Sequence, residues 1–242
     1  MAVAKGHQAN YKNIGGVAPC PGGWLVLPGR LAGVTVSAEE AFVVRRLLDV
    51  LDYRPRFEFA AVNIPFGYPA EPTPGYRQCD REAREYVGWP RLVSLRPVPS
   101  RPALFANSRA EAVELEPWLT RNDFRHFRWM REAANEIQPF HSRSFYSGNA
   151  ELSFQHMNGE EPLRTSPYHV DGEAERLRLV ADRLPGVEEV VGRVPPEGAG
   201  MIHMLNAAAM LWTARRASGR AITRLPLDAE WDEAGIRVEL VR

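Results

Sequence analysis

Residues 57–63 read Phe-Glu-Phe-Ala-Ala-Val-Asn, a mostly apolar run that predicts a strand buried on both faces. A helix is predicted before it, because Ser37 and Glu40 form a capping box and apolar residues recur at helical spacing over 42–51. Residues 17–36 predict three short strands, the first two joined by a Pro/Gly-rich turn. Three antiparallel strands, a helical crossover and a parallel strand together predict a mixed α/β sheet flanked by helices.

The rest of the chain alternates helical patterns with loops rich in proline and glycine. Three prolines between Arg96 and Pro102 exclude regular structure there. Helices are predicted over residues 77–86, 123–137, 151–157, 171–184 and 201–218, and short strands over 144–147 and 236–241. We therefore predict one domain over residues 14–242 after a flexible segment at 1–13, with a loop-rich insertion into the sheet at 64–145.

The composition is that of a globular protein and excludes several classes. Of 242 residues, 45% are hydrophobic, and 30 Lys and Arg balance 30 Asp and Glu. The chain thus lacks the strongly basic balance of many nucleic-acid-binding proteins, although a local basic patch stays open. Cys20 and Cys79 are too few for a disulfide framework, and no secretory signal or membrane-length apolar run occurs. We expect a soluble, cytoplasmic protein.

Short motifs follow one another in a characteristic order. The first is Gly16-Val17-Ala18-Pro19-Cys20-Pro21-Gly22-Gly23-Trp24, followed by Asn63-Ile64-Pro65-Phe66-Gly67-Tyr68 and by an Arg-x-Cys-Asp-x-x-Ala-Arg string over 77–84. Later blocks lie at 147–154, 172–177 and 205–207, the last followed by Trp212-Thr213-Ala214-Arg215. Over residues 14–225 these motifs resemble the bacterial and archaeal domain-of-unknown-function family four hundred and twenty-nine, often described as predicted ribonuclease-H-like nucleases.

That resemblance implies a ribonuclease-H-like fold, in which acidic side chains from two strands and a late helix meet at one end of the sheet. Such acids hold two divalent ions about 3.5–4 Å apart, which activate water for hydrolysis. Carried over by position, the family's acids fall at Ala18, Asn63, Ser147 and Asn206, and none is acidic here. The resemblance therefore implies a member without the two-metal site, in which magnesium or manganese is expected only if nuclease activity is retained.

The retained motif residues have a functional and a structural interpretation each. Arg77, Asp80 and Arg84 share one helical face, which favours either a clamp for a phosphate or carboxylate or a buried ion-pair network. In the first motif, Gly22 and Gly23 either offer backbone N–H groups to a ligand or form a tight turn. Trp24 either stacks on a base or packs in the core, and the Cys20 thiol is either reactive or buried.

Two further groups carry open alternatives. His156, His169 and His203 are potential zinc ligands, but they lack the paired spacing of a zinc site. Residues 121–131 interleave four arginines with Phe124, Phe127, Trp129 and Met130. That pattern is typical of an amphipathic helix with a solvated basic face, or of a surface for nucleic acid or an anionic partner.

Three hypotheses follow. The first is a degenerate ribonuclease-H-like protein that binds a nucleic acid, a nucleotide or a protein partner through the former active cleft. The second is an enzyme acting on a small anionic substrate there, with Arg77, Asp80, Arg84, Asn63 and Cys20 as its residues. The third is a metal-dependent nuclease with relocated ligands, namely Asp80, Glu151 and either Asp171 or His203.

Overall fold

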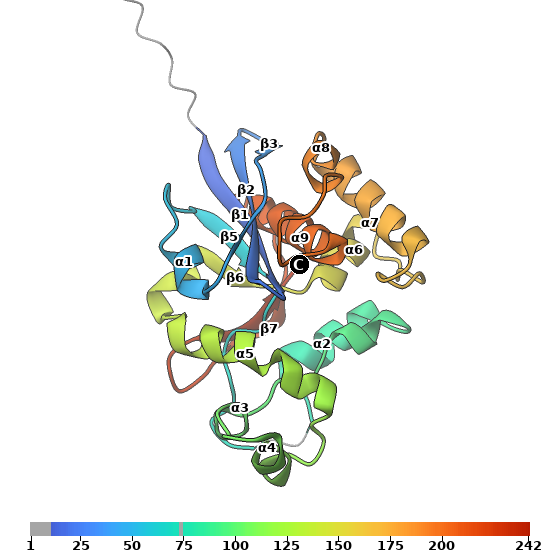
Figure 1. Ribbon diagram of the computed structural model, residues 1–242. Coiled ribbons are helices and arrows are strands. Elements are labelled where there is room, and N and C mark those ends of the chain that lie inside the picture. Colours follow the sequence, from blue (N-terminus) through green and yellow to red (C-terminus); the bar gives the residue numbers. More distant parts are fainter. Residues whose placement is uncertain (1–10, 73–74) are drawn as a thin grey trace, which may run out of the picture.

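A computed structural model describes residues 11–72 and 75–242, and its centre is a mixed sheet (Figure 1). The strand order is β3-β2-β1-β5-β6, built from β3 (Thr35–Ala38), β2 (Gly23–Ala32), β1 (Lys12–Cys20), β5 (Phe59–Val62) and β6 (Phe145–Ser147). Strands β1, β2 and β3 pair antiparallel, while β5 pairs parallel with β1 and β6 parallel with β5. The predicted mixed α/β sheet is thereby confirmed.

The start of the predicted flexible segment lies outside the described residues, since residues 1–10 are not described. Its last two residues, Lys12 and Asn13, already belong to β1 and pair with Leu31 and Arg30 of β2.

The helix predicted over 42–51 is wrong in its first half. Residues 42–44 form strand β4 (Phe42–Val44), which pairs with β2 over Trp24 to Val26. Only α1 (Leu47–Leu51) is helical, and Ser37 lies in β3 opposite Arg30 instead of capping a helix. The physical reason is that an aromatic and two β-branched residues in succession favour a pleated ladder, and β2 offers unpaired backbone groups there.

Helices cover both faces of the sheet (Figure 1). On one face, α6 (Ala150–Met157), α7 (Val170–Arg183), α8 (Glu188–Val191) and α9 (Met201–Ser218) share a core with Ile14, Ala18 and Leu25. On the other face, α1 and α5 (Arg121–Glu136) share a core with Val17, Trp24 and Val26. Alternate residues of β1 thus enter opposite cores, as the two-residue period of a strand requires.

A long excursion between β5 and β6 forms the lower part of the molecule in Figure 1. It contains α2 (Gln78–Val87), η1 (Arg91–Ser94), α3 (Arg101–Leu104), α4 (Arg109–Leu115), α5 and η2 (Pro139–Arg143). This segment corresponds to the predicted insertion at 64–145, and short capped helices occupy much of what the prolines and glycines suggested was loop. Ser100 and Ser108, for example, cap α3 and α4.

The chain closes with an antiparallel hairpin of β7 (Arg224–Trp231) and β8 (Arg237–Val241). Only β8 was expected, because Pro226 and the acidic residues of β7 are poor strand signals. Irregular register between Leu225 and Glu230 accommodates them. Among the described residues, none of the helices combines the length and apolar character needed to cross a bilayer.

Candidate functional site

Three of the four positions at which the family resemblance implies acids lie at the carboxyl edge of the sheet. Val17 pairs with Val62, and Val62 with Ser147, so β5 and β6 end at the same level while β1 continues to Cys20. The Asn63 backbone N–H donates to the Val17 carbonyl at 2.8 Å, and that of Gly148 donates to Val62 at 2.9 Å. Ala18 and Asn63 are therefore neighbours on one face of the sheet, whereas Ser147 lies opposite Val62 and faces the other side.

The fourth position, Asn206, is brought to the same edge by helix α9. A Cβ placed on Gly16 would lie 1.9 Å from the Ala207 carbonyl oxygen, so α9 rests directly on the backbone of β1. Just before α9, the Gly198 carbonyl accepts a hydrogen bond from the Gly22 N–H at 2.8 Å. These two contacts lay the first turns of α9 along the carboxyl half of β1, beside Ala18.

The side chains at these positions are neutral and take part in the fold. Ala18 is fully buried in the core beneath α9. The Asn63 Oδ1 accepts from the Ala150 N–H at 3.0 Å, which satisfies a donor at the start of α6. The Ser147 hydroxyl donates to the Ile64 carbonyl at 2.9 Å and accepts from the Phe66 N–H at 3.1 Å. The edge thus retains its shape without negative charge.

Asp80, at the start of α2, is held by Arg77 in a buried bidentate pair. Arg77 Nε and Nη2 donate to the two carboxylate oxygens at 2.7 Å each. Its Nη1 donates to the carbonyls of Phe66 and Gly67, also at 2.7 Å. Although burial alone lowers it, the Asp80 charge raises the pKa of Arg77, which stays protonated. The pair ties α2 to the loop that leaves Asn63, and four of the five N–H donors of Arg77 are used by the fold.

Glu151, in the first turn of α6, forms the second buried pair. Arg176 Nη2 donates to both of its oxygens at 2.8 Å, and Nε donates to Oε1 at 3.1 Å. The Nη1 of Arg176 donates to the Gly172 carbonyl at 3.0 Å. Within the described ranges, no group of three or more His, Cys, Asp or Glu is placed to hold a metal ion.

Arg84 lies on α2, which follows Arg77, and has different partners. Its Nη1 donates to the carbonyls of Leu92 and Leu95 at 2.8 and 2.7 Å, and its guanidinium lies 4.3 Å from the centre of the Tyr76 ring. Arg84 therefore holds the segment that follows α2, and it makes no hydrogen bond to the Arg77–Asp80 pair among the contacts described.

The β1–β2 turn is packed against α5. Trp24 is fully buried and donates its indole N–H to Glu132 at 2.8 Å. Arg128 donates to the carbonyls of Cys20 and Pro21, both at 3.1 Å, and Trp129 donates to the Gly23 carbonyl at 2.9 Å. The interleaved arginines and aromatics of α5 thus include residues that hold this turn in place, and Gly23, with φ of +132°, adopts a conformation that favours glycine.

The family described as Protein of unknown function (DUF429) matches residues 16–230. The chain belongs to this family. No curated protein and no solved structure matches it. The DUF429 description names no activity.

Both cysteines, Cys20 and Cys79, are buried and free, without a disulfide. Burial raises the pKa of Cys79 from 9.0 to about 12, and burial likewise raises the pKa of Cys20. A thiol is nucleophilic only as the thiolate, so both groups are poorly reactive near neutral pH. This environment is that of structural cysteines.

We expect native protein at about pH 8 to react with a thiol reagent much more slowly than urea-unfolded protein, at both Cys20 and Cys79. Because the pKa of Cys79 is higher in the folded than in the unfolded protein, its contribution to the free energy of unfolding is complete below about pH 9. That contribution falls as the pH rises toward 12. Colorimetric titration of the Cys20→Ser and Cys79→Ser variants shows at which rate each remaining cysteine reacts. Rapid labelling of one native thiol would contradict the structural assignment.

The three histidines considered as zinc ligands have separate partners. His203 Nδ1 accepts from the Gly200 N–H at 2.9 Å, at the start of α9. His156 Nδ1 lies 2.7 Å from Glu160, and His169 precedes α7. The pKa values of His203 and His156 are lowered, chiefly by burial. In the part of the chain that the structure describes, they form no common site.

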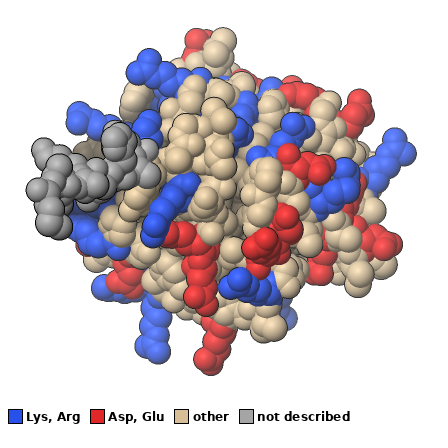
Figure 2. All heavy atoms as spheres, turned by 90° about the horizontal axis from the view of Figure 1, so that it is seen from above, with Lys and Arg blue, Asp and Glu red and all other residues tan. Residues whose placement is uncertain are grey.

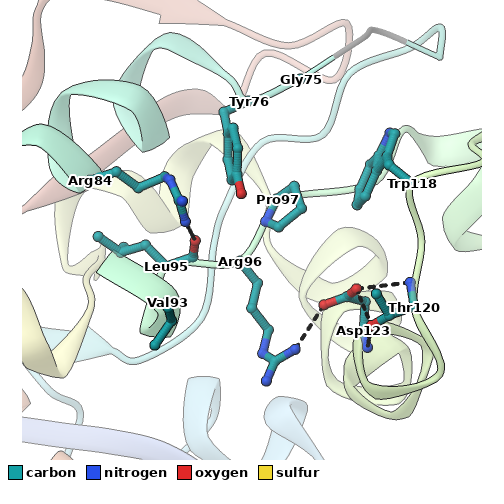
Figure 3. A pocket seen from close by; sticks show the side chains of 10 residues that line it. All are labelled: Gly75, Tyr76, Arg84, Val93, Leu95, Arg96, Pro97, Trp118, Thr120 and Asp123. Carbon is teal, nitrogen blue, oxygen red and sulfur yellow. Dashed lines mark hydrogen bonds and ion pairs between the residues drawn. The ribbon is translucent and has the colours of Figure 1, made fainter. Parts of the chain in front are cut away.

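A pocket of about 420 Å³ between α2 and α5 was not predicted from the sequence (Figure 3). We name it the α2–α5 pocket and define it by Tyr76, Arg84, Arg96, Pro97, Trp118 and Asp123. Arg96 Nη1 donates to Asp123 at 2.9 Å, and the Thr120 N–H donates to the same carboxylate at 2.9 Å. Although burial opposes this effect, the hydrogen bonds from Thr120 and Arg96 hold the pKa of Asp123 below its ordinary value. Arg84 and the three prolines after Arg96 were the only sequence signals, and neither identifies a pocket.

Proposed function

We propose that this DUF429 protein is a ribonuclease-H-like protein that binds a nucleic acid or nucleotide at the carboxyl edge of its sheet without two-metal hydrolysis. The observation that carries the proposal is that Ala18, Asn63 and Asn206, all neutral, meet on one face of this edge, with the neutral Ser147 on the neighbouring strand. The strand order β3-β2-β1-β5-β6, antiparallel and then parallel, supports the ribonuclease-H-like assignment.

Electrostatics explains why such an edge is a poor two-metal site. Magnesium gives up its water ligands reluctantly and needs anionic oxygens in near-octahedral positions. Asn63 and Ser147 provide only neutral oxygens, and these already accept hydrogen bonds from Ala150 and Phe66. A nearby pair of cations would therefore lack the charge that offsets dehydration.

The two buried carboxylates near the edge are poor substitutes for the lost acids. Asp80 and Glu151 each pair through both oxygens with a buried arginine. A metal that took either carboxylate would leave an uncompensated buried guanidinium, which costs about 3–5 kcal/mol. This cost disfavours the hypothesis of a nuclease with relocated ligands.

The charge distribution favours a local binding site. On the face shown in Figure 2, basic and acidic side chains are interspersed, so this side presents no broad basic surface for a duplex. In the α2–α5 pocket, by contrast, Arg84 and Arg96 lie with two aromatic side chains. Aromatic rings and guanidinium groups together are typical of sites for single strands and nucleotides.

We expect no magnesium- or manganese-stimulated cleavage of single- or double-stranded DNA or RNA above a no-enzyme control, with labelled substrates resolved on denaturing gels. Labelled single strands should nevertheless bind in a fluorescence-anisotropy titration. Cleavage that requires manganese and is abolished by EDTA would overturn the proposal.

A gain-of-charge variant sharpens this test. Asn63→Asp keeps the acceptor for the Ala150 N–H and adds charge at the start of α6, where the helix dipole favours an anion. Together with Asn206→Asp, it should tighten manganese binding by at least about tenfold in calorimetry. The matched control Asn107→Asp, on the exposed segment between α3 and α4, should leave manganese affinity unchanged. Equal affinity for all three proteins would show that these positions do not share a site.

A further inference from the structure

The α2–α5 pocket has two aromatic walls. Figure 3 shows Tyr76 and Trp118 on opposite sides of Pro97, with the opening between them. Its volume of about 420 Å³ lies within the range of small-molecule sites. A hollow flanked by aromatic side chains suits a planar ring, because flat π-systems stack on one another with little loss of side-chain freedom.

The Tyr76 wall is held in place by the fold. Arg84 covers one side of the ring, while Pro97 and Trp118 lie toward the other side (Figure 3). Arg84 is in turn fixed by the Leu92 and Leu95 carbonyls at 2.8 and 2.7 Å. A preorganised wall loses little entropy when a ligand stacks on it, which favours affinity.

The charges of the pocket favour an anionic ligand. Arg84 and Arg96 supply two guanidinium groups and Asp123 one carboxylate. Asp123 pairs with Arg96 at 2.9 Å and also accepts from Thr120, so it compensates only one of the two cations. The remaining positive charge complements a phosphate attached to the ring.

The pocket is also connected to the sheet edge through both of its helices. Arg84 lies seven residues along α2 from Arg77, or about 10 Å, and Arg77 donates to the Phe66 carbonyl. Asp123 lies five residues along α5 from Arg128, or about 8 Å, and Arg128 donates to the Cys20 carbonyl. A ligand that follows the edge can therefore place one base in the pocket.

We propose that the α2–α5 pocket binds the base of a nucleotide between Tyr76 and Trp118, with its phosphate toward Arg96. The nucleotide is either free or one unit of a single strand, and this inference rests on the proposed function. It adds the residues that recognise the ligand, none of which belongs to the neutral edge positions.

The test is a fluorescence-anisotropy titration with labelled single-stranded RNA and DNA twelve-mers, with AMP, adenosine and inorganic phosphate as competitors. Trp118→Ala should weaken binding by about 5- to 140-fold, the loss typical of one base–aromatic stack. Trp118→Phe should retain most of the affinity. The matched control Trp231→Ala removes an exposed indole of β7 and should have no effect.

The competitors distinguish the two sources of the ligand. Displacement of the strand by AMP, but not by adenosine or phosphate alone, indicates a free-nucleotide site, whereas the absence of displacement by AMP indicates recognition within a strand. Strand binding that is equal in wild type and Trp118→Ala, with equal thermal midpoints, would overturn the pocket and leave the proposed function standing. Failure of every strand and nucleotide to bind would overturn both.

Discussion

Arg77→Met is expected to lower the free energy of unfolding by about 3–5 kcal/mol, the cost of leaving one partner of a buried ion pair alone. The substitution strips Asp80 of both bidentate hydrogen bonds and leaves the carbonyls of Phe66 and Gly67 without their donor. Arg77 and Asp80 are both buried, so solvent cannot replace these bonds easily.

Urea denaturation followed by circular dichroism measures this loss. Arg125→Met, on the exposed face of α5, is the matched control and should stay within about 0.5 kcal/mol of wild type. Arg77→Met/Asp80→Asn should recover part of the loss, because the remaining buried partner is then neutral. The clamp interpretation makes a different forecast, namely unchanged stability and lost affinity for an anionic ligand.

Arg176→Met is expected to cost a similar amount, about 3–5 kcal/mol, for the same electrostatic reason. Arg176 is fully buried and makes three hydrogen bonds of 3.1 Å or less to Glu151. Without them, the Glu151 carboxylate would remain buried and unpaired in the first turn of α6, beside the hydrogen bond from Ala150 to Asn63. We therefore expect α6 to loosen together with the sheet edge.

Hydrogen exchange combined with thermal unfolding tests both parts of this prediction. Faster exchange at 150–157 together with a lower midpoint is the expected result. The control is Arg178→Met, because Arg178 is an exposed residue of α7, the helix that carries Arg176. Arg176→Met/Glu151→Gln should be more stable than the single variant. A loss below about 1 kcal/mol for Arg176→Met would mean that water compensates Glu151 and that the pair contributes little.

Local patterns predicted the elements whose signals do not depend on distant partners. Helix α9 ends before Gly219, as its sequence indicated, and α2, α5, α6 and α7 lie close to their predicted ranges. Residues 42–44 show the limit of such patterns. Their apolar spacing predicts a helix, but they form a strand because they pair with β2. The role of Ser147 likewise depended on Ile64 and Phe66, residues 83 and 81 positions away.

The sequence by itself determined the mixed sheet, the family motifs and the absence of acids at Ala18, Asn63, Ser147 and Asn206, since strand periodicity and residue identity are local properties. Only the tertiary structure decided that Asp80 and Glu151 are neutralised by buried arginines, and that Tyr76 and Trp118 line one pocket. The reason is physical: charge compensation and pocket shape depend on distances between residues far apart in the chain. Spacing along a sequence does not encode those distances.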